Sequence, residues 1–162
     1  MGEAFTEQLV RQKMTGKTML KLVGLVALVL VSIVATMILP ILSVLVVVAL
    51  FVAYYFGKRL MCVEFEYVYF NGELDIDRIM GMEARKRLLS TSVKDMEVLA
   101  PSGASVLQPY QNLKVYDCST NSGNHTYELV AKVKEQNVRI IFEPNEEILQ
   151  GMRYYAPRKV YL

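Results

Sequence analysis

Two short charged motifs hold the residue types in this sequence that could do chemistry. Asp75 and Asp77 form a D-x-D pair, and Arg85, Lys86 and Arg87 form a basic triplet. Alternate residues of a β-strand share one face, so the two aspartates point the same way, as do the two arginines. Paired carboxylates suit a hard cation such as Mg²⁺, but the sequence places no histidine or third acid beside them. We therefore predict no metal site here, and expect polar strand positions that face the basic triplet.

Three interpretations of the basic triplet are open at the level of sequence. It can form a solvated strand face paired with the D-x-D aspartates, contact lipid phosphates, or dock an acidic partner. Lys58 and Arg59, directly after a long apolar block, would join any lipid contact. These cations are the candidate lipid or partner contacts.

The remaining reactive side chains do not form a catalytic set. His125 is the single histidine, and it lies in a turn-forming stretch. Cys62 and Cys118 are too far apart for a redox or zinc motif, and neither they nor Ser90 have a base placed beside them. The sequence contains no glycine-rich phosphate loop or nucleophile elbow. We expect a protein that is not an enzyme and that uses no cofactor.

The elements that position these residues begin with an apolar block, Leu22–Phe56, that has no charged side chain. A single helix over this block would span roughly 50 Å at 1.5 Å per residue, whereas a bilayer core is about 30 Å thick. Pro40 lies near the middle, and proline interrupts a helix because it lacks an N–H and clashes with the preceding turn. We predict a transmembrane hairpin over 19–59, with helices at about 20–39 and 43–56 joined by a tight turn.

Basic residues flank the block on both sides. The flanking cations are Arg11, Lys13, Lys17 and Lys21 before the block, and Lys58 and Arg59 after it. Because Lys and Arg stay on the cytoplasmic side, both ends are expected there, which requires an even number of crossings. We predict a multi-pass protein of the plasma membrane whose termini and soluble part are cytoplasmic. The net charge of +2 reflects these flanks and does not indicate nucleic-acid binding, which needs a basic face on the folded domain.

A row of small residues lies in the second predicted helix. Ala49, Ala53 and Gly57 follow one another at four-residue spacing. Small residues let helices approach closely in lipid. The row either packs the two hairpin helices together or forms an interface with a second copy or a partner, and both alternatives are open.

The lead, residues 1–18, precedes the hairpin. Phe5 and Leu9 recur at helical spacing, and Glu7 can pair with Arg11 one turn later. We expect a short, basic, amphipathic helix that lies on the membrane or on the soluble domain.

The soluble domain, 60–162, alternates apolar and polar side chains in several short runs. Val63–Tyr67 and Leu74–Asp77 flank Asn71 and Gly72. An Asn-Gly pair between two alternating runs is a strong hairpin signal, because both turn positions need positive φ. The same pattern predicts five further strands, at about 84–89, 95–99, 114–118, 127–133 and 138–142.

The apolar spacing then changes to that of a helix. Asn145 is suited to cap it, and Ile148, Leu149, Met152 and Tyr155 fall on one helical face. We predict an α+β domain in which one curved, seven-stranded antiparallel sheet or barrel is capped by this helix. We expect the apolar tail Val160–Leu162 to make an ordered contact, as a strand added to a sheet edge. Disorder of the tail is the alternative.

The order of seven strands and one helix resembles a pleckstrin-homology (PH) fold. The whole chain is also similar to a family of small bacterial membrane proteins of unknown function, which have a basic lead, a two-helix hairpin and a PH-like cytoplasmic domain. The motifs that carry this resemblance are Glu7–Val10, Thr15–Lys17, Val63–Tyr67, Asn71–Asp77 and Arg85–Ser90. The resemblance implies a fold and not an activity, because one fold serves many functions.

These observations together predict a non-enzymatic, membrane-anchored PH-like module. We expect it to bind a protein or peptide partner, or a second copy of itself, at the cytoplasmic face. The alternative is a sensor of anionic lipid. PH-like phosphoinositide binders use basic residues around the first hairpin, and here that hairpin, Asn71–Glu73, is short and acidic. A small enzyme is the third hypothesis.

Overall fold

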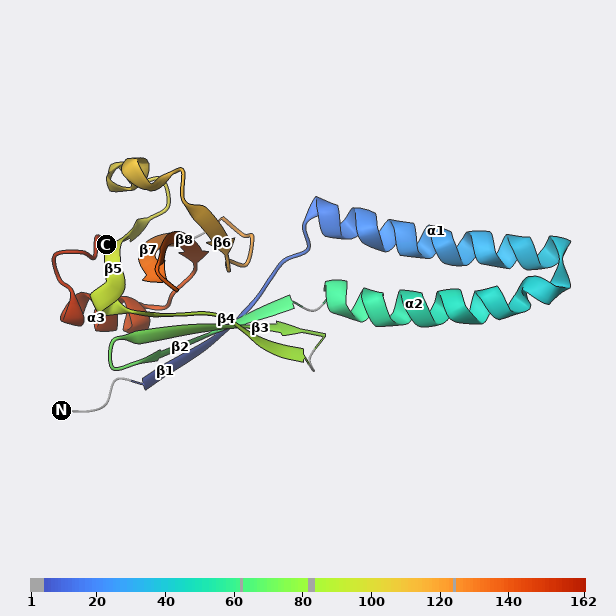
Figure 1. The fold of residues 1–162 in the computed structure, drawn as a ribbon, viewed down its shortest axis with the longest axis horizontal. Coiled ribbons are helices and arrows are strands. Elements are labelled where there is room, and N and C mark those ends of the chain that lie inside the picture. The colour runs from blue at the N-terminus through green and yellow to red at the C-terminus, as the bar shows by residue number, and fades with distance from the viewer. Residues whose placement is uncertain (1–4, 62, 82–83, 124) are drawn as a thin grey trace.

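The chain folds into a long helical hairpin and a β-rich domain at its base (Figure 1). The computed structural model describes residues 5–61, 63–81, 84–123 and 125–162. The domain contains two four-stranded sheets and a C-terminal helix. Both ends of the hairpin join the domain on the same side.

Sheet A consists of β1 (Phe5–Arg11), β2 (Val63–Phe70), β3 (Glu73–Met80) and β4 (Ala84–Ser92). The strands are antiparallel and lie in the order of the chain. Asn71 and Gly72 join β2 to β3 with φ angles of 48° and 86°, the left-handed conformation that a two-residue hairpin turn requires. The predicted Asn-Gly hairpin is confirmed.

The prediction of an amphipathic helix in the lead is wrong, because Phe5–Arg11 forms strand β1. Leu9 pairs with Glu66 and Arg11 with Glu64, so the strand completes sheet A. The Gln8 side chain ties it to the far side of the domain: Nε2 donates to the Glu143 carbonyl at 2.9 Å, and Oε1 accepts from the Asn145 N–H at 2.7 Å. Helical spacing of Phe5 and Leu9 also fits a strand, since residues four apart share a strand face.

The hairpin is therefore an insertion between two neighbouring strands. It contains α1 (Gly16–Ile38), a 3₁₀ turn η1 (Pro40–Leu42) and α2 (Ser43–Met61). Both helices are long and apolar enough to cross a membrane, and they fit a membrane hairpin broken at Pro40, as expected. α2 continues past its predicted end at Phe56, so Lys58 and Arg59 lie in its last turn.

Sheet B consists of β5 (Met96–Pro101), β6 (Lys114–Asp117), β7 (Tyr127–Val133) and β8 (Gln136–Phe142). Its order is β5-β7-β8-β6, and β6 runs parallel to β8. The prediction of one seven-stranded, wholly antiparallel sheet or barrel is wrong: the described residues form two sheets and no closed barrel. Short 3₁₀ turns, η2 (Val93–Asp95) and η3 (Ser105–Tyr110), follow β4 and β5.

Helix α3 (Glu146–Tyr155) closes the core between the sheets. The Asn145 side chain accepts from the Ile148 N–H at 2.9 Å, which satisfies one of the free N–H groups of the first turn. The apolar face predicted for this helix is buried at Ile148, Leu149 and Met152, whereas Tyr155 at its end is 49 % exposed. It packs in one cluster with residues of both sheets, among them Tyr67, Tyr69, Ile76, Leu99, Leu129, Ile140 and Phe142.

The C-terminal tail makes the ordered contact expected of it. Val160 forms a parallel bridge with Leu99 of β5. The Leu99 N–H donates to the Lys159 carbonyl and the Tyr161 N–H donates to the Leu99 carbonyl, both at 2.8 Å. The tail thus occupies the outer edge of sheet B.

Candidate functional site

The outer face of sheet A, which points away from the core, carries a network of charged side chains. Asp77 accepts from the Nε atoms of Arg85 at 2.7 Å and of Arg87 at 3.4 Å. Arg87 also pairs with Asp75 at 3.1 Å, and Arg85 with Glu66. The predicted pairing of the D-x-D aspartates with the two arginines is confirmed.

Two pKa shifts follow from this network. Burial raises the pKa of Glu66, and the hydrogen bond that the protonated Glu66 donates to the neighbouring Glu7 carboxylate raises it further, while Arg85 opposes the shift. The hydrogen bond to Asp77 raises the pKa of Arg85, so its guanidinium stays charged. The two arginines thus offset the charge of both aspartates within the sheet.

The third member of the triplet is separated from its neighbours. Lys86 lies in register with Arg78 of β3, on the opposite face from the two arginines. Lys58 and Arg59 lie further away, at the end of α2, where each cation stands over a tyrosine ring: Lys58 Nζ over Tyr54 at 5.1 Å and Arg59 Cζ over Tyr55 at 4.5 Å. The predicted lipid or partner contacts therefore lie in three places: the outer face of sheet A, its opposite face and the end of α2.

Strand β1 is an edge strand of sheet A. Among the described residues it pairs only with β2, on one side. The Gln12 N–H donates to the Val63 carbonyl at 2.9 Å, and hydrogen-bonded pairs alternate along an antiparallel ladder. By this register the N–H groups of Glu7 and Leu9 point away from β2. The edge thus presents free backbone groups.

Exposed apolar side chains accompany this edge. Phe5, Leu9 and Phe70 project from the outer face with 60 %, 59 % and 40 % of their surface exposed. The rings of Phe5 and Phe70 meet edge to face, with centroids 6.5 Å apart. An open strand edge beside exposed apolar groups is a ready template for another strand.

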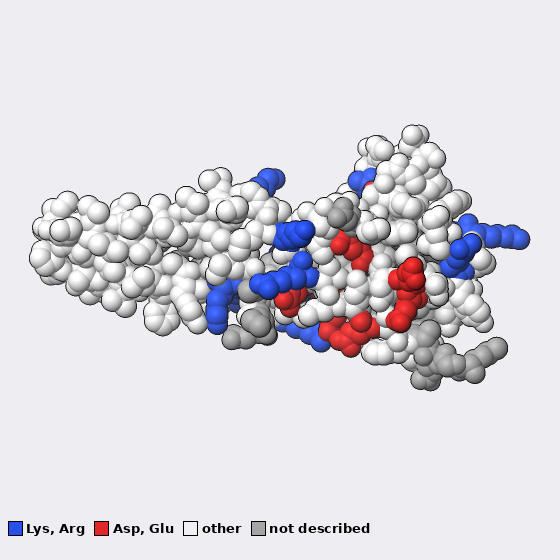
Figure 2. Space-filling view, turned by 180° about the vertical axis from the view of Figure 1, so that it is seen from behind, with Lys and Arg blue, Asp and Glu red and all other residues white. Residues whose placement is uncertain are grey.

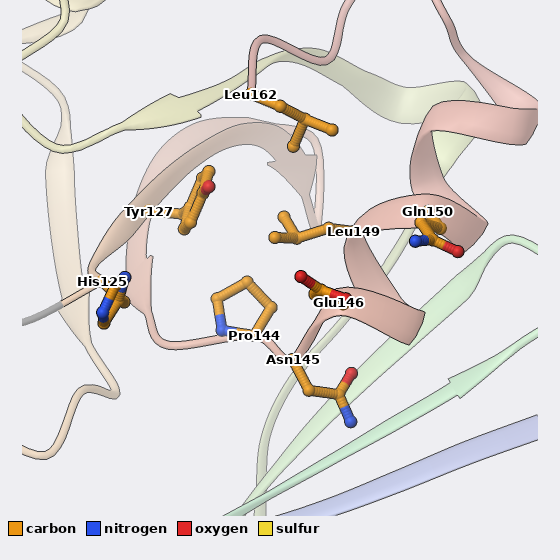
Figure 3. A pocket seen from close by; sticks show the side chains of 8 residues that line it. All are labelled: His125, Tyr127, Pro144, Asn145, Glu146, Leu149, Gln150 and Leu162. Carbon is orange, nitrogen blue, oxygen red and sulfur yellow. The ribbon is translucent and has the colours of Figure 1, made fainter.

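A cavity of about 470 Å³ opens at the start of α3 (Figure 3). Tyr127, Pro144, Leu149 and Leu162 surround its centre, and His125 lies at its edge. His125 has a φ of 52° and is exposed, as its predicted surface position requires. The cavity brings together the His125 imidazole, the Glu146 carboxylate and apolar groups, which suits contact with a ligand.

A family model described as Bacterial PH-like domain (DUF6106) matches residues 2–162. The chain belongs to this family. The match covers both the hairpin and the domain, and the family is one of unknown function. No curated protein and no solved structure matches the chain.

In this PH-like protein the row of small residues on α2 is at least partly buried. Ala49 and Gly57 are buried and Ala53 is half-buried. Along the hairpin α2 packs against α1. Of the two alternatives, packing between the hairpin helices has structural support.

The sequence did not predict the open sheet edge that β1 forms at Phe5 and Leu9. No local pattern marks it, because β1 acquires its meaning only when it pairs with β2 beyond the hairpin. In the structure Thr6, Gln8 and Val10 are more buried than their neighbours. The sequence does not show this alternation, because the apolar Phe5 and Leu9 fall on the exposed face.

Proposed function

We propose that this protein is a non-enzymatic, membrane-anchored PH-like module that binds an extended segment of a partner protein along β1. The open edge of β1, with the N–H groups of Glu7 and Leu9 directed outward, is the observation that carries the proposal. Strand addition to a sheet edge is a common mode of peptide recognition, in which backbone hydrogen bonds supply affinity and side chains supply specificity.

Charge near the edge defines the chemistry of the partner. The outer face beside β1 carries Glu7, Glu64 and Glu66, and the pKa of Glu66 is raised by burial and by Glu7. A Lys or Arg on the added strand opposite Glu7 would relieve this crowding of carboxylates. We therefore propose a segment that alternates basic and apolar residues, the apolar ones covering Leu9 and Phe5.

The hairpin anchors the module in the membrane. Because Arg11 and Glu64 pair in one sheet, the two ends of the hairpin lie together, so the helices cross an even number of times. The cations at its root favour a cytoplasmic position for these ends under the positive-inside rule. Figure 2 shows Lys and Arg side chains gathered where the hairpin meets the domain, and none along the hairpin beyond it.

Anionic lipid recognition is a second candidate function, favoured by the position of Lys58 and Arg59. These cations stand over Tyr54 and Tyr55 in the last turn of α2. Tyrosine and basic side chains together are typical of the headgroup region of a membrane.

Site-specific photo-crosslinking in cells tests the partner hypothesis. A photoreactive residue replaces Leu9 on the edge, and a control replaces Tyr154, which is 75 % exposed on α3. We expect one protein adduct from position 9 and none from position 154. Adducts of equal yield at both positions, or an adduct of twice the chain's mass, would argue against a distinct partner on β1.

A matched pair of variants isolates the backbone contribution. Glu7→Pro and Glu7→Ala both remove the carboxylate, but only proline also removes the outward N–H, a change that edge strands tolerate. We expect Glu7→Pro to abolish the adduct at position 9 and Glu7→Ala to keep a third or more of it. Equal losses would show that the carboxylate, not strand addition, holds the partner.

A further inference from the structure

A small basic cavity lies at the root of the hairpin. Its volume is about 130 Å³. The β1–α1 link, the start of α1, the end of α2 and strand β3 all contribute to its lining, through Gln12, Lys13, Thr18, Lys21, Arg59 and Arg78. Segments far apart in the sequence thus converge on one site, which neither the β1 edge nor the charged outer face of sheet A includes.

The lining contains four cations and no carboxylate. None of the four pairs with an acidic side chain among residues 5–61, 63–81, 84–123 and 125–162. Their situation differs from that of Arg85 and Arg87, which Asp75, Asp77 and Glu66 neutralise. Convergent like charges repel one another, and a bound anion offsets that repulsion.

Arg78 adds a donor that lacks an acceptor. It lies on the core-facing side of β3, in register with Phe65, which is 2 % exposed. Its Nε atom is buried and has no hydrogen-bond partner among the described residues. A buried donor without a partner is costly, so such groups in native proteins are usually satisfied by water, an ion or a ligand.

The cavity lies at the depth of the lipid headgroups when the hairpin is inserted. Lys21 directly precedes the uncharged run of α1, and Arg59 closes α2 just after Tyr55. Arg59 lies over the Tyr55 ring with 4.5 Å between Cζ and the ring centre. A guanidinium has five N–H donors, so a contact with a ring leaves donors for phosphate.

We propose that this cavity binds the phosphate group of an anionic phospholipid in the leaflet that faces the domain. Basic pockets between helices at a membrane surface recognise such headgroups, and Arg presents donors in the geometry of phosphate oxygens. The inference deepens the second candidate function and rests on insertion of the hairpin. It assigns the binding to Lys21, Arg59 and Arg78, and not to the cationic surface at large.

Native mass spectrometry of the full chain in detergent tests the site, with phosphatidylglycerol as the probe. We expect one retained lipid per chain, and none with zwitterionic phosphatidylcholine. Lys21→Gln or Arg59→Gln should weaken retention about fivefold, which corresponds to about 1 kcal/mol per cation. Arg78→Gln should weaken it by more, and an unchanged melting temperature would show that the variant is folded.

Lys17→Gln is the matched control. Lys17 lies one turn before Lys21 on α1 and does not line the cavity, so this variant should retain lipid like the original chain. Equal weakening by Lys17→Gln and Lys21→Gln would overturn the cavity while leaving lipid recognition by surface charge intact. No retained phosphatidylglycerol would overturn both. Stabilisation by inorganic phosphate without lipid retention would overturn the lipid assignment and identify a soluble phosphate as the ligand.

Discussion

Gly151 of α3 faces the ring of Tyr69 of β2 so closely that a Cβ atom at position 151 would lie 2.5 Å from Tyr69 Cε1. Tyr69 is fully buried, so its ring has little room to move away. The glycine therefore sets the distance at which α3 packs on sheet A. Glycine is otherwise unfavourable inside a helix, which indicates that close packing outweighs helix propensity here.

We predict that Gly151→Ala destabilises the domain by about 1–2 kcal/mol, because overpacking costs about 1–3 kcal/mol and alanine recovers up to about 1 kcal/mol of propensity. Denaturant unfolding of the domain, followed by circular dichroism of its tyrosines, measures the change. Gln150→Ala is the control: residue 150 is exposed on the same helix, so its substitution should be neutral. A Gly151→Ala variant as stable as the original chain would contradict the packing argument.

Alkaline pH should destabilise the domain through its buried thiol and phenols. Burial raises the pKa of Cys118 from 9.0 to about 12 and that of Tyr69 from 10.0 to about 12. Tyr67 is also buried, and its hydroxyl donates to the Cys118 carbonyl at 2.5 Å. These groups stay protonated in the folded state, so their contribution is complete below pH 9 and is lost as pH rises toward 12, at up to about 1.4 kcal/mol per pH unit for each group.

Cys118→Ala should flatten the first part of this profile. Between pH 9 and pH 10 the thiol is the first of these groups to ionise in the unfolded chain, so its removal should reduce the slope of unfolding free energy against pH. Above pH 10 the tyrosines should keep the slope. The comparison is made in a Cys62→Ser background, and an unchanged slope below pH 10 would show that Cys118 does not control the alkaline limit.

The two aspartates of the D-x-D pair should differ in their contribution to stability. Asp77 binds both Arg85 and Arg87, and its side chain is 7 % exposed, whereas Asp75 binds Arg87 alone and is 26 % exposed. We predict that Asp77→Asn costs about 1–2 kcal/mol, because it weakens two charge-assisted hydrogen bonds. Asp75→Asn should cost under about 1 kcal/mol. Equal effects in denaturant unfolding would show that the second arginine contact is without energetic consequence.

The positions of β2, β3, β7 and β8 followed from the sequence because apolar and polar residues alternate along them. The Asn-Gly turn and the paired Asp77 and Arg85 followed from the same period of two. The strand conformation of β1 could not be predicted from the sequence. Leu9 pairs with Glu66, on the other side of the hairpin in the chain, and such distant pairing leaves no local signal. Residue spacing also could not separate a helix from a strand at Phe5 and Leu9.

The arrangement of the second sheet was beyond the sequence for a different reason. Lys114–Asp117 was expected as a strand, but alternation carries no information about which neighbour it joins or in which direction. The connection from β5 to β6 includes η3, and β6 runs parallel to β8. Which strands become neighbours, and in which direction, depends on how side chains fill the core. The basic cavity is similar: Lys13, Arg59 and Arg78 come together only through the fold.

The topology of the hairpin yields the last prediction. Ile41 lies in the turn at its tip and is 84 % exposed, while Ser102 is exposed on the domain. In a Cys62→Ser background, where the remaining native Cys118 is fully buried, a cysteine at either position gives a single accessible thiol. A membrane-impermeant maleimide should label Ile41→Cys in intact cells and Ser102→Cys only after permeabilisation. The reverse pattern would place the domain outside the cell, and labelling of both positions from one side would contradict a hairpin that crosses the membrane.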